Sequence, residues 1–356
     1  MTSSISNSET RAASADPWRR FCRRLLVFAL VLAGAVYAFV FVVDPFDTLS
    51  LSPPFDRGPV STNARYAFPA LARKSRFDSV ILGTSTSRLL RPAELDPIFG
   101  AHFVNLAMNS ATAYEQWRLG EVFARAHPDA RFVLIGLDVV WCEIGDTVEK
   151  YTPRSFPEWL YDDDPWNDYL EQFNLYAVEQ AGIQFGVLTG LNRQRYGRDG
   201  YTNFLPDDRS YDPARAKTHL NRDVAPDRGA ATTAAAAGAT FRYPALPLLK
   251  DLLAIMPRDA VKLVYFVPYH RSGQPLPGSP AAQQWAQCKA DVAAIVAAAQ
   301  HARLVDFMIP SSVTLRDDNY WDPLHYRIGV ATWLTRSLRA AMDGPPRVEQ
   351  EGYVVY

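Results

Sequence analysis

SVILGTSTSR, the stretch from Ser79 to Arg88, decides the fold that we predict for this chain. Its first residues form a short apolar run, which predicts a buried strand. The run ends at Gly83, where glycine lets the backbone turn sharply and lets a substrate approach closely. Ser85 then lies on the turn, the place from which many α/β enzymes expose a nucleophile. The alternative is a hydroxyl-rich loop that only caps the next helix.

Apolar runs and helical patterns alternate through the rest of the chain. Further strands are predicted at 103–107, 131–138, 261–267 and 304–307, and helices at 63–74, 114–126, 281–302 and 328–342. This alternation predicts right-handed βαβ units and therefore a parallel sheet of about five strands with helices on both faces. The α/β domain is expected to span residues 61–345, with a tail at 346–356.

The N-terminal region carries the pattern of a membrane anchor. Residues 1–24 include five arginines and are expected to form a disordered cytoplasmic tail. Residues 25–43 contain no charge and are about long enough to cross the hydrocarbon core as a helix. The arginines predict a cytoplasmic N-terminus, an inner-membrane anchor and a main domain outside the cytoplasm, which is the periplasm if the source is a Gram-negative bacterium. A cleaved signal peptide is the alternative, but Ala33 to Ala35 lie within the run rather than after it.

Two segments do not fit the alternating pattern. Residues 44–60 are rich in proline and are expected to form a stiff, extended connector. An insertion at about 142–244 separates the third and fourth predicted strands, with a helix expected at 169–188 and a flexible loop at 228–240. Ligands bind beside the carboxyl ends of an open parallel sheet, so the insertion is either a cap over a site or a surface decoration.

The composition excludes some classes of function. Lys and Arg number 37 against 38 Asp and Glu, a balance that gives no electrostatic case for binding nucleic acid. The sequence has no spaced His/Cys cluster and no Gly-rich phosphate loop, so neither a metal nor an organic cofactor is expected. Cys142 and Cys288 either pair in an oxidising compartment or remain separate buried thiols.

The segment WDPLHY, from Trp321 to Tyr326, places Asp322 three residues before His325. Together with the Ser85 turn, it resembles the SGNH (GDSL-like) hydrolase superfamily. That family has a Gly-Asp-Ser turn after its first strand and an Asp-x-x-His pair near its C-terminus. The likeness covers roughly residues 76–342 and departs from the family at Thr84, where Asp is usual. It implies a three-layer, flavodoxin-like fold.

The resemblance also implies a catalytic triad. Ser85 would be the nucleophile, and His325 would accept its proton, because imidazole titrates near neutral pH. Asp322 would orient the imidazole ring and stabilise its charged form.

An oxyanion hole is expected beside the triad. In the superfamily, a Gly after the second strand and an Asn after the third join the amide of the nucleophile. Here Ser110 or its neighbour Asn109 takes the place of the Gly, and Asp138 stands where Asn is expected. A carboxylate facing an oxyanion is unfavourable. Therefore Asp138 points elsewhere, Asn109 supplies the donor, or the protein is not a competent hydrolase.

Two further polar residues are candidates for binding substrate. Arg88 follows Ser85 by three residues and suits an anionic group of an acyl donor or acceptor; a salt bridge to Asp138 or Glu115 is the alternative. His270 follows the fourth predicted strand and either binds substrate or is an ordinary loop residue.

The anchor, the serine site and the insertion together resemble the membrane-anchored SGNH-like proteins that modify cell-envelope polymers. Alginate O-acetyltransferases and the proteins that attach D-alanine to teichoic acids are examples. The resemblance implies acyl transfer to, or deacylation of, an exported glycan through an acyl-Ser85 intermediate, with a multi-spanning membrane acyltransferase as a possible partner. One alternative is a catalytically degenerate glycan-binding or assembly subunit, suggested by Thr84 and Asp138. Another is an esterase for small or lipid esters.

Overall fold

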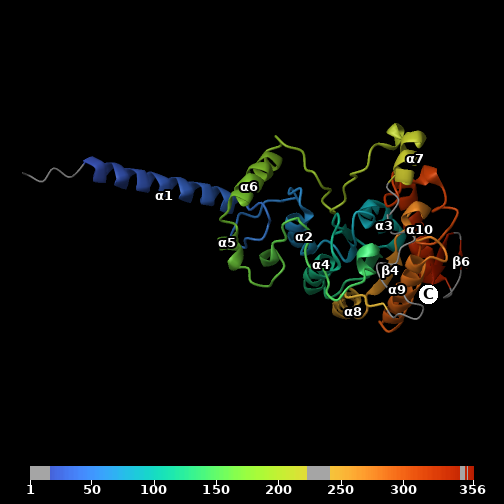
Figure 1. Ribbon diagram of the computed structural model, residues 1–356. Helices are drawn as coiled ribbons and strands as arrows, with labels where there is room; N and C mark the ends of the chain where they lie inside the picture. Colours follow the sequence, from blue (N-terminus) through green and yellow to red (C-terminus); the bar gives the residue numbers. More distant parts are fainter. Residues whose placement is uncertain (1–16, 223–240, 345–348, 351) are drawn as a thin grey trace, which may run out of the picture.

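The first strand of the sheet along the chain is β1 (Ser79–Leu82), whose four residues are all buried. The computed structural model describes residues 17–222, 241–344, 349–350 and 352–356 (Figure 1). Burial along the whole strand is typical of a parallel sheet with both faces covered. Four more strands continue the sheet in parallel: β2 (Phe103–Asn105), β3 (Phe132–Leu137), β4 (Val261–Phe266) and β5 (Ala302–Asp306).

The strands follow the order β2-β1-β3-β4-β5-β7-β6. Its parallel part, 2-1-3-4-5, is one of the two common orders of doubly wound α/β folds. In such a sheet the switch point lies between β1 and β3, because the chain leaves β1 toward one edge and later returns to the other side. Ligands bind beside the carboxyl ends of the strands at this point. The predicted parallel α/β sheet is confirmed, and Ser85 lies just past the end of β1.

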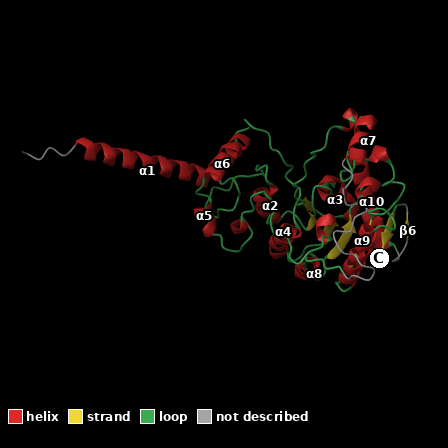
Figure 2. Ribbon diagram, viewed as in Figure 1, coloured by secondary structure: helices red, strands yellow, loops and turns green. Residues whose placement is uncertain are grey.

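The helices form two groups according to their contacts. α3 (Pro92–Phe99) packs against α10 (Ile328–Asp343). In the second group, contacts run in turn through α2 (Ala64–Ala72), α4 (Ala113–Ala126), α8 (Leu246–Ile255) and α9 (Pro280–Ala297). Right-handed crossovers carry α3 to one face of the sheet and α4, α8 and α9 to the other. Figure 2 shows α3 beside α10 and α4 near α8.

α1 (Pro17–Val43) extends away from the domain for most of its length (Figure 1). It is long and apolar enough to span a membrane, as expected for residues 25–43. It begins earlier than predicted, so residues 17–24 of the predicted tail are helical.

The connector at 44–60 is not the extended linker that its prolines predict. Asp44 is buried and accepts hydrogen bonds from the Thr48 and Leu49 N–H groups, at 3.2 and 3.1 Å. Arg57 is also buried and donates to the carbonyl oxygens of Val43 (2.7 Å) and Val42 (3.1 Å). These bonds fold the connector onto the last turn of α1 and occupy carbonyl groups that a helix end leaves unpaired.

The insertion contains α5 (Asn167–Glu171), α6 (Leu175–Leu188) and α7 (Pro213–Arg222). The single helix predicted at 169–188 is two helices, because Asn174 has an extended backbone and its side chain caps α6 at the Ala177 N–H, 2.9 Å away. The loop predicted at 228–240 lies outside the described residues.

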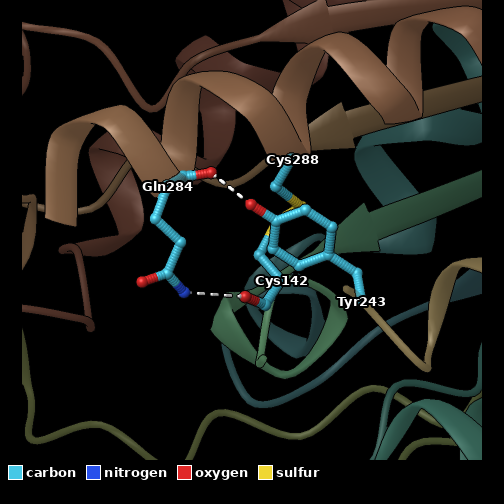
Figure 3. The surroundings of a disulfide bond; sticks show 4 residues. All are labelled: Cys142, Tyr243, Gln284 and Cys288. Atoms are coloured by element: carbon cyan, nitrogen blue, oxygen red, sulfur yellow. Dashed lines mark hydrogen bonds between the residues drawn. A yellow bond between two sulfur atoms is a disulfide. The ribbon is translucent and has the colours of Figure 1, made fainter. Parts of the chain in front are cut away.

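The two ends of the insertion are attached to α9 (Figure 3). Cys142, where the insertion begins, forms a disulfide with Cys288 of α9. Tyr243, where it ends, donates its hydroxyl hydrogen to the Gln284 carbonyl oxygen at 2.6 Å. The pairing of these cysteines, which the sequence left open, is therefore present.

The predicted tail at 346–356 contributes two strands instead. β7 (Tyr353–Val355) pairs antiparallel with β5, and β6 (Glu349–Gln350) pairs with β7. Tyr353 and Val355 are buried against the sheet, and this packing supplies the free energy that so short a strand needs.

Candidate active site

The turn after β1 holds Ser85 through close backbone packing. Gly83 has φ +149°, and a Cβ atom there would lie 2.4 Å from the Ser87 hydroxyl oxygen. Only glycine fits such a position. The Gly83 carbonyl oxygen also accepts a hydrogen bond from the Met108 N–H (3.0 Å), which ties the turn to the segment after β2. Ser85 itself stays half-exposed.

Ser85, His325 and Asp322 form a continuous chain of hydrogen bonds. Ser85 Oγ lies 2.8 Å from His325 Nε2. His325 Nδ1 lies 2.8 Å from one carboxylate oxygen of Asp322 and 3.1 Å from the other. Because a carboxylate can only accept, the ring proton belongs on Nδ1, which leaves the Nε2 lone pair facing the serine hydroxyl. The structure thus brings together the three predicted catalytic residues.

Asp322 is held in its ionised form. Burial opposes ionisation, but the His325 ring and the N–H groups of Leu324 and His325 outweigh it, and the pKa of Asp322 lies below its ordinary value. Both N–H groups donate to the same carboxylate oxygen at 2.8 Å. The carboxylate is therefore fixed in position as well as in charge, as a group that orients a histidine must be.

Tyr326 joins the histidine loop to the serine turn. Its buried hydroxyl group donates to the Thr86 carbonyl oxygen at 2.5 Å. The loop that carries His325 is thereby bonded to the turn that carries Ser85, across 240 residues of sequence. The sequence analysis missed this residue, although its position directly after His325 was a usable signal.

Asp138 lies beneath the serine turn. Its carboxylate accepts from the hydroxyl groups of Thr84, Thr86 (3.1 Å) and Tyr269 (2.7 Å). Burial raises the pKa of this carboxyl above its ordinary value, although the three hydroxyl groups oppose the shift. Of the three possibilities weighed for Asp138, its contacts match the first: the carboxylate is engaged with residues on both sides of Ser85.

Asn109 and Ser110 lie in the segment between β2 and α4, from which the sequence analysis expects an oxyanion donor. Asn109 Oδ1 accepts from Arg88 Nη1 at 2.9 Å, which turns the amide N–H₂ group away from Arg88. Ser110 has φ +53°, in the left-handed region that favours glycine. The backbone of Ser110 thus has a conformation that glycine adopts more readily than serine. The Ser85 N–H makes no hydrogen bond within the described part of the chain, so it is available as a third donor.

Arg88 is buried without an acidic partner among the described residues. Its guanidinium group lies 4.9 Å from the centre of the Tyr196 ring, and its Nε has no hydrogen-bond partner there. The salt bridge to Asp138 or Glu115 is not formed, since Glu115 pairs with the buried Arg65 instead. A buried cation is costly unless an anion compensates it.

Phe204 brings the insertion into the site. Its ring meets the His325 ring edge-to-face with centroids 5.6 Å apart, and its centroid lies 6.0 Å from the guanidinium carbon of Arg88. Tyr196, the other aromatic beside Arg88, also belongs to the insertion. Neither residue was predicted from the sequence, because neither lies in a motif.

Both ring nitrogens of His270 form hydrogen bonds with residues other than Ser85. One ring nitrogen lies 2.8 Å from Ser272 Oγ and the other 3.2 Å from Asp317 Oδ1. The His270 N–H donates to the Pro323 carbonyl oxygen at 3.0 Å, within the loop that carries Asp322 and His325. His270 thus helps to hold the loop that carries Asp322 and His325.

The described residues contain no group of three or more His, Cys, Asp or Glu side chains placed to hold a metal ion. A comparison with protein-family models finds no match, and a comparison with curated proteins finds none either. The site's own geometry therefore carries the functional assignment.

Proposed function

We propose that this chain is a membrane-anchored serine acyltransferase or esterase that acts outside the cytoplasm on an exported cell-envelope glycan. The observation that carries the proposal is the hydrogen-bonded chain Ser85–His325–Asp322, with 2.8 Å at each of its two links. Such a chain activates a serine that is unreactive at its own pKa.

Membership of the SGNH (GDSL-like) superfamily is part of the proposal. The 2-1-3-4-5 order of the parallel strands supports it, as does the position of Ser85 directly after β1. The left-handed backbone of Ser110, at the place of the family's Gly, supports it further.

Acylation begins with the transfer of the Ser85 Oγ proton to His325 Nε2. Oγ forms a bond to the acyl carbon of the donor, and the carbonyl π electrons move onto the oxygen. The N–H of Ser85 and the amide of Asn109 stabilise this oxyanion, while Asp322 balances the charged imidazole. The electron pair of the oxyanion then re-forms the carbonyl bond, the bond from the acyl carbon to the leaving oxygen breaks, and His325 protonates that oxygen, which yields acyl-Ser85.

Deacylation repeats these steps with a new nucleophile. A hydroxyl group of the glycan, or water, gives its proton to His325 and attacks the acyl carbon. The bond to Oγ breaks, Oγ takes the proton back from His325, and the product is a glycan ester or a free acid. Phe204 covers one side of His325 and favours an acceptor over bulk water by limiting the access of solvent.

Arg88 gives the substrate a preferred charge. It is a buried cation without an acidic partner in the described structure, and it shares Phe204 with His325. A carboxylate or phosphate group on the donor or the glycan acceptor would supply the missing anion.

Two observations support a location outside the cytoplasm. The disulfide between Cys142 and Cys288 is typical of an oxidising compartment. The four arginines in the first turns of α1, at positions 19, 20, 23 and 24, favour a cytoplasmic N-terminus, which places the domain on the opposite side of the inner membrane. An alkaline phosphatase fusion after Asp47 tests this orientation, and we expect the reporter to be active. A multi-spanning membrane acyltransferase remains the proposed source of the acyl group.

Two other functions are less well supported by the contacts around Ser85. The departures from the family at Thr84 and Asp138 suggest a catalytically degenerate binding subunit. However, the Thr84 hydroxyl group donates to the Asp138 carboxylate, so both residues have a structural role in holding the serine turn, and they are weaker evidence against catalysis. An esterase for small or lipid esters would turn over p-nitrophenyl esters without any glycan.

The testing experiment is the intact mass of the protein after exposure to activated acetyl donors. We expect a gain of one acetyl group that is absent in Ser85→Ala. A gain that persists in this variant would show another nucleophile. Failure of wild type to react with several donors and with a fluorophosphonate probe would favour the binding subunit.

A further inference from the structure

α6 places two glutamines on its buried side and two large apolar residues on its exposed side. Its buried residues are Ala177, Gln180, Ala181, Gln184 and Gly186. Leu175, by contrast, is 87% exposed and Phe185 46% exposed. A surface helix in water has the opposite arrangement, with apolar residues toward the core. The exposed side chains of Leu175 and Phe185 are therefore suited to an apolar environment.

The turn between α5 and α6 is the most apolar part of this surface. Phe173 is 62% exposed, and Leu170 on α5 is 81% exposed. Leu175 is the first residue of α6, directly after its N-cap residue Asn174, so the three exposed side chains lie within six residues of one another. An exposed apolar patch of this size marks an interaction site with a protein or a membrane.

This surface is continuous with the candidate membrane helix. Tyr37 of α1 meets Phe173 edge-to-face at 5.4 Å and donates its hydroxyl hydrogen to the Tyr169 carbonyl oxygen at 2.5 Å. Phe39 of α1 meets Phe185 in the same way at 5.8 Å. Between the two helices runs an apolar groove whose walls include Ala29, Val36, Phe173 and Leu175. Figure 1 shows α6 beside the C-terminal end of α1.

The position of α1 fixes how deep these contacts lie. Four arginines at positions 19, 20, 23 and 24 keep the start of α1 at the cytoplasmic surface, because a charged side chain is costly in hydrocarbon. The 19 uncharged residues from Leu25 to Val43 then span about 28 Å at 1.5 Å per residue, close to the whole apolar layer. Tyr37 lies six residues before Val43 and hence about 9 Å inside that layer.

We propose that the α5–α6 turn, Phe173 to Leu175, inserts into the outer leaflet of the same bilayer that α1 spans. A depth of about 5–10 Å is usual for helices that lie in the membrane interface. The proposal rests on the membrane-spanning role of α1 and not on the chemistry at Ser85. The bonds of Arg57 to the last carbonyl groups of α1 hold the helix and the domain together at this level.

Residues around the turn agree with this depth. Trp166 is 66% exposed and stacks on Tyr169, as aromatic residues do at the level of the lipid headgroups. Three consecutive aspartates, 162 to 164, precede it and are suited to the water beyond. Glu171 is exposed before the turn, and Glu179 is exposed on α6 one turn after Leu175, so the charges on either side limit the insertion to the turn and to the outer part of the leaflet.

The test uses the full-length chain with Cys22→Ser, so that one introduced cysteine can carry an environment-sensitive nitrobenzoxadiazole label. The labelled positions are Leu175→Cys at the turn, Val31→Cys within α1 and Leu315→Cys as a control. Val31 is 65% and Leu315 49% exposed, so each accepts a label. Each protein is reconstituted into phosphatidylcholine–phosphatidylglycerol vesicles, with and without brominated acyl chains.

We expect bromine to quench the labels at positions 175 and 31 and to leave the label at 315 unchanged. Bromine placed near the headgroups should quench position 175 more strongly than bromine at the chain ends, and position 31 should show the opposite preference. If position 31 is quenched while 175 behaves like 315, α1 spans the membrane and the proposed insertion is wrong. Quenching of 175 by aqueous iodide alone would likewise overturn it, because the turn would then lie in water. None of these outcomes depends on whether Ser85 is acylated.

Discussion

His325 and His270 form two chains of the same three residue types. Each histidine has a serine hydroxyl group at 2.8 Å from one ring nitrogen and an aspartate on the other, at 2.8 Å for Asp322 and 3.2 Å for Asp317. In each chain the aspartate fixes one ring proton, and the opposite nitrogen presents its lone pair to the serine. Hydrogen bonding alone therefore does not distinguish a nucleophile from a structural serine.

Access and surroundings distinguish the two chains. The His270 side chain is 2% exposed and that of His325 is 22% exposed. Ser272 is two residues from its histidine, in the 3₁₀ turn η5 (Arg271–Gly273), and its N–H also donates to the ring at 3.1 Å. Ser85 instead follows a parallel strand at the switch point, and two hydrogen bonds join its surroundings to the segment that carries Asn109: Met108 N–H to the Gly83 carbonyl oxygen (3.0 Å) and Arg88 Nη1 to Asn109 Oδ1 (2.9 Å). A reactive serine needs room for a substrate and donors for its oxyanion.

The largest expected difference is between Ser85→Ala and Ser272→Ala. Removing the Ser85 hydroxyl should abolish acylation completely, since no other group lies against His325 Nε2 in the described contacts. Removing the Ser272 hydroxyl should leave acylation intact and cost about 1 kcal/mol of unfolding free energy, because the Ser272 N–H still bonds the ring. Fluorophosphonate labelling and thermal unfolding measure the two effects. Loss of labelling in Ser272→Ala, with its fold intact, would make the two chains functionally equivalent.

The histidines should separate activity from stability. His325→Ala should lower the acylation rate by about 10⁴-fold, nearly as much as loss of the serine, since nucleophile and base act as a unit. Its fold should survive, because the ring is partly exposed. His270→Ala should cost about 2 kcal/mol of stability through its lost buried hydrogen bonds, with activity falling only as the Asp322 loop loosens. The measurements are single-turnover acylation and chemical denaturation of both variants.

Substitution of Asp322 should lower the acylation rate much more than substitution of Asp317. In Asp322→Asn the amide N–H₂ group facing Nδ1 would force the ring proton onto Nε2, so that the ring no longer accepts from Ser85. We expect a loss on the order of 10³-fold in acylation rate. Asp317→Asn can still accept from His270 and should acylate at a rate close to wild type. A milder effect of Asp322→Asn than of Asp317→Asn would contradict the assigned tautomer.

The fold was largely predictable because its central strands are continuous apolar runs. β1, β3 and β4 are buried on both faces, so their sequences alone mark them. β7 escaped prediction, since three residues carry no periodicity and are strand only because β5 pairs with them. The connector escaped for a related reason: its prolines suggest an extended chain, but the buried Asp44 and Arg57 satisfy its backbone through distant contacts.

Within the site, motif order predicted the residues but not the direction of their side chains. Ser85, Asp322 and His325 were found because their spacing resembles one family, and their contacts agree with that expectation. Whether Asp138 faced the oxyanion or the turn depended on Tyr269, which comes from the next strand's end. The role of Phe204 depended on how the insertion folds back, and local sequence does not encode that.

Asp138→Asn gives the smallest and most specific effect, because it changes the support of the Ser85 turn and leaves the catalytic chain in place. The raised pKa of Asp138 means that the folded protein binds a proton more tightly there than the unfolded chain does. Stability of the wild type should therefore fall as pH rises from the unfolded pKa of about 3.9 through the higher folded value. The amide that replaces the carboxyl group cannot titrate, so the unfolding free energy of Asp138→Asn minus that of wild type should become more positive over the same rise in pH.

Acylation by Asp138→Asn should fall about tenfold, because the amide donates where Thr84, Thr86 and Tyr269 need an acceptor. Thermal unfolding between pH 4 and 8 measures the first effect, with Asp317→Asn as the control. A rise in acylation instead would mean that the new amide reaches the oxyanion, and that position 138 faces the substrate after all.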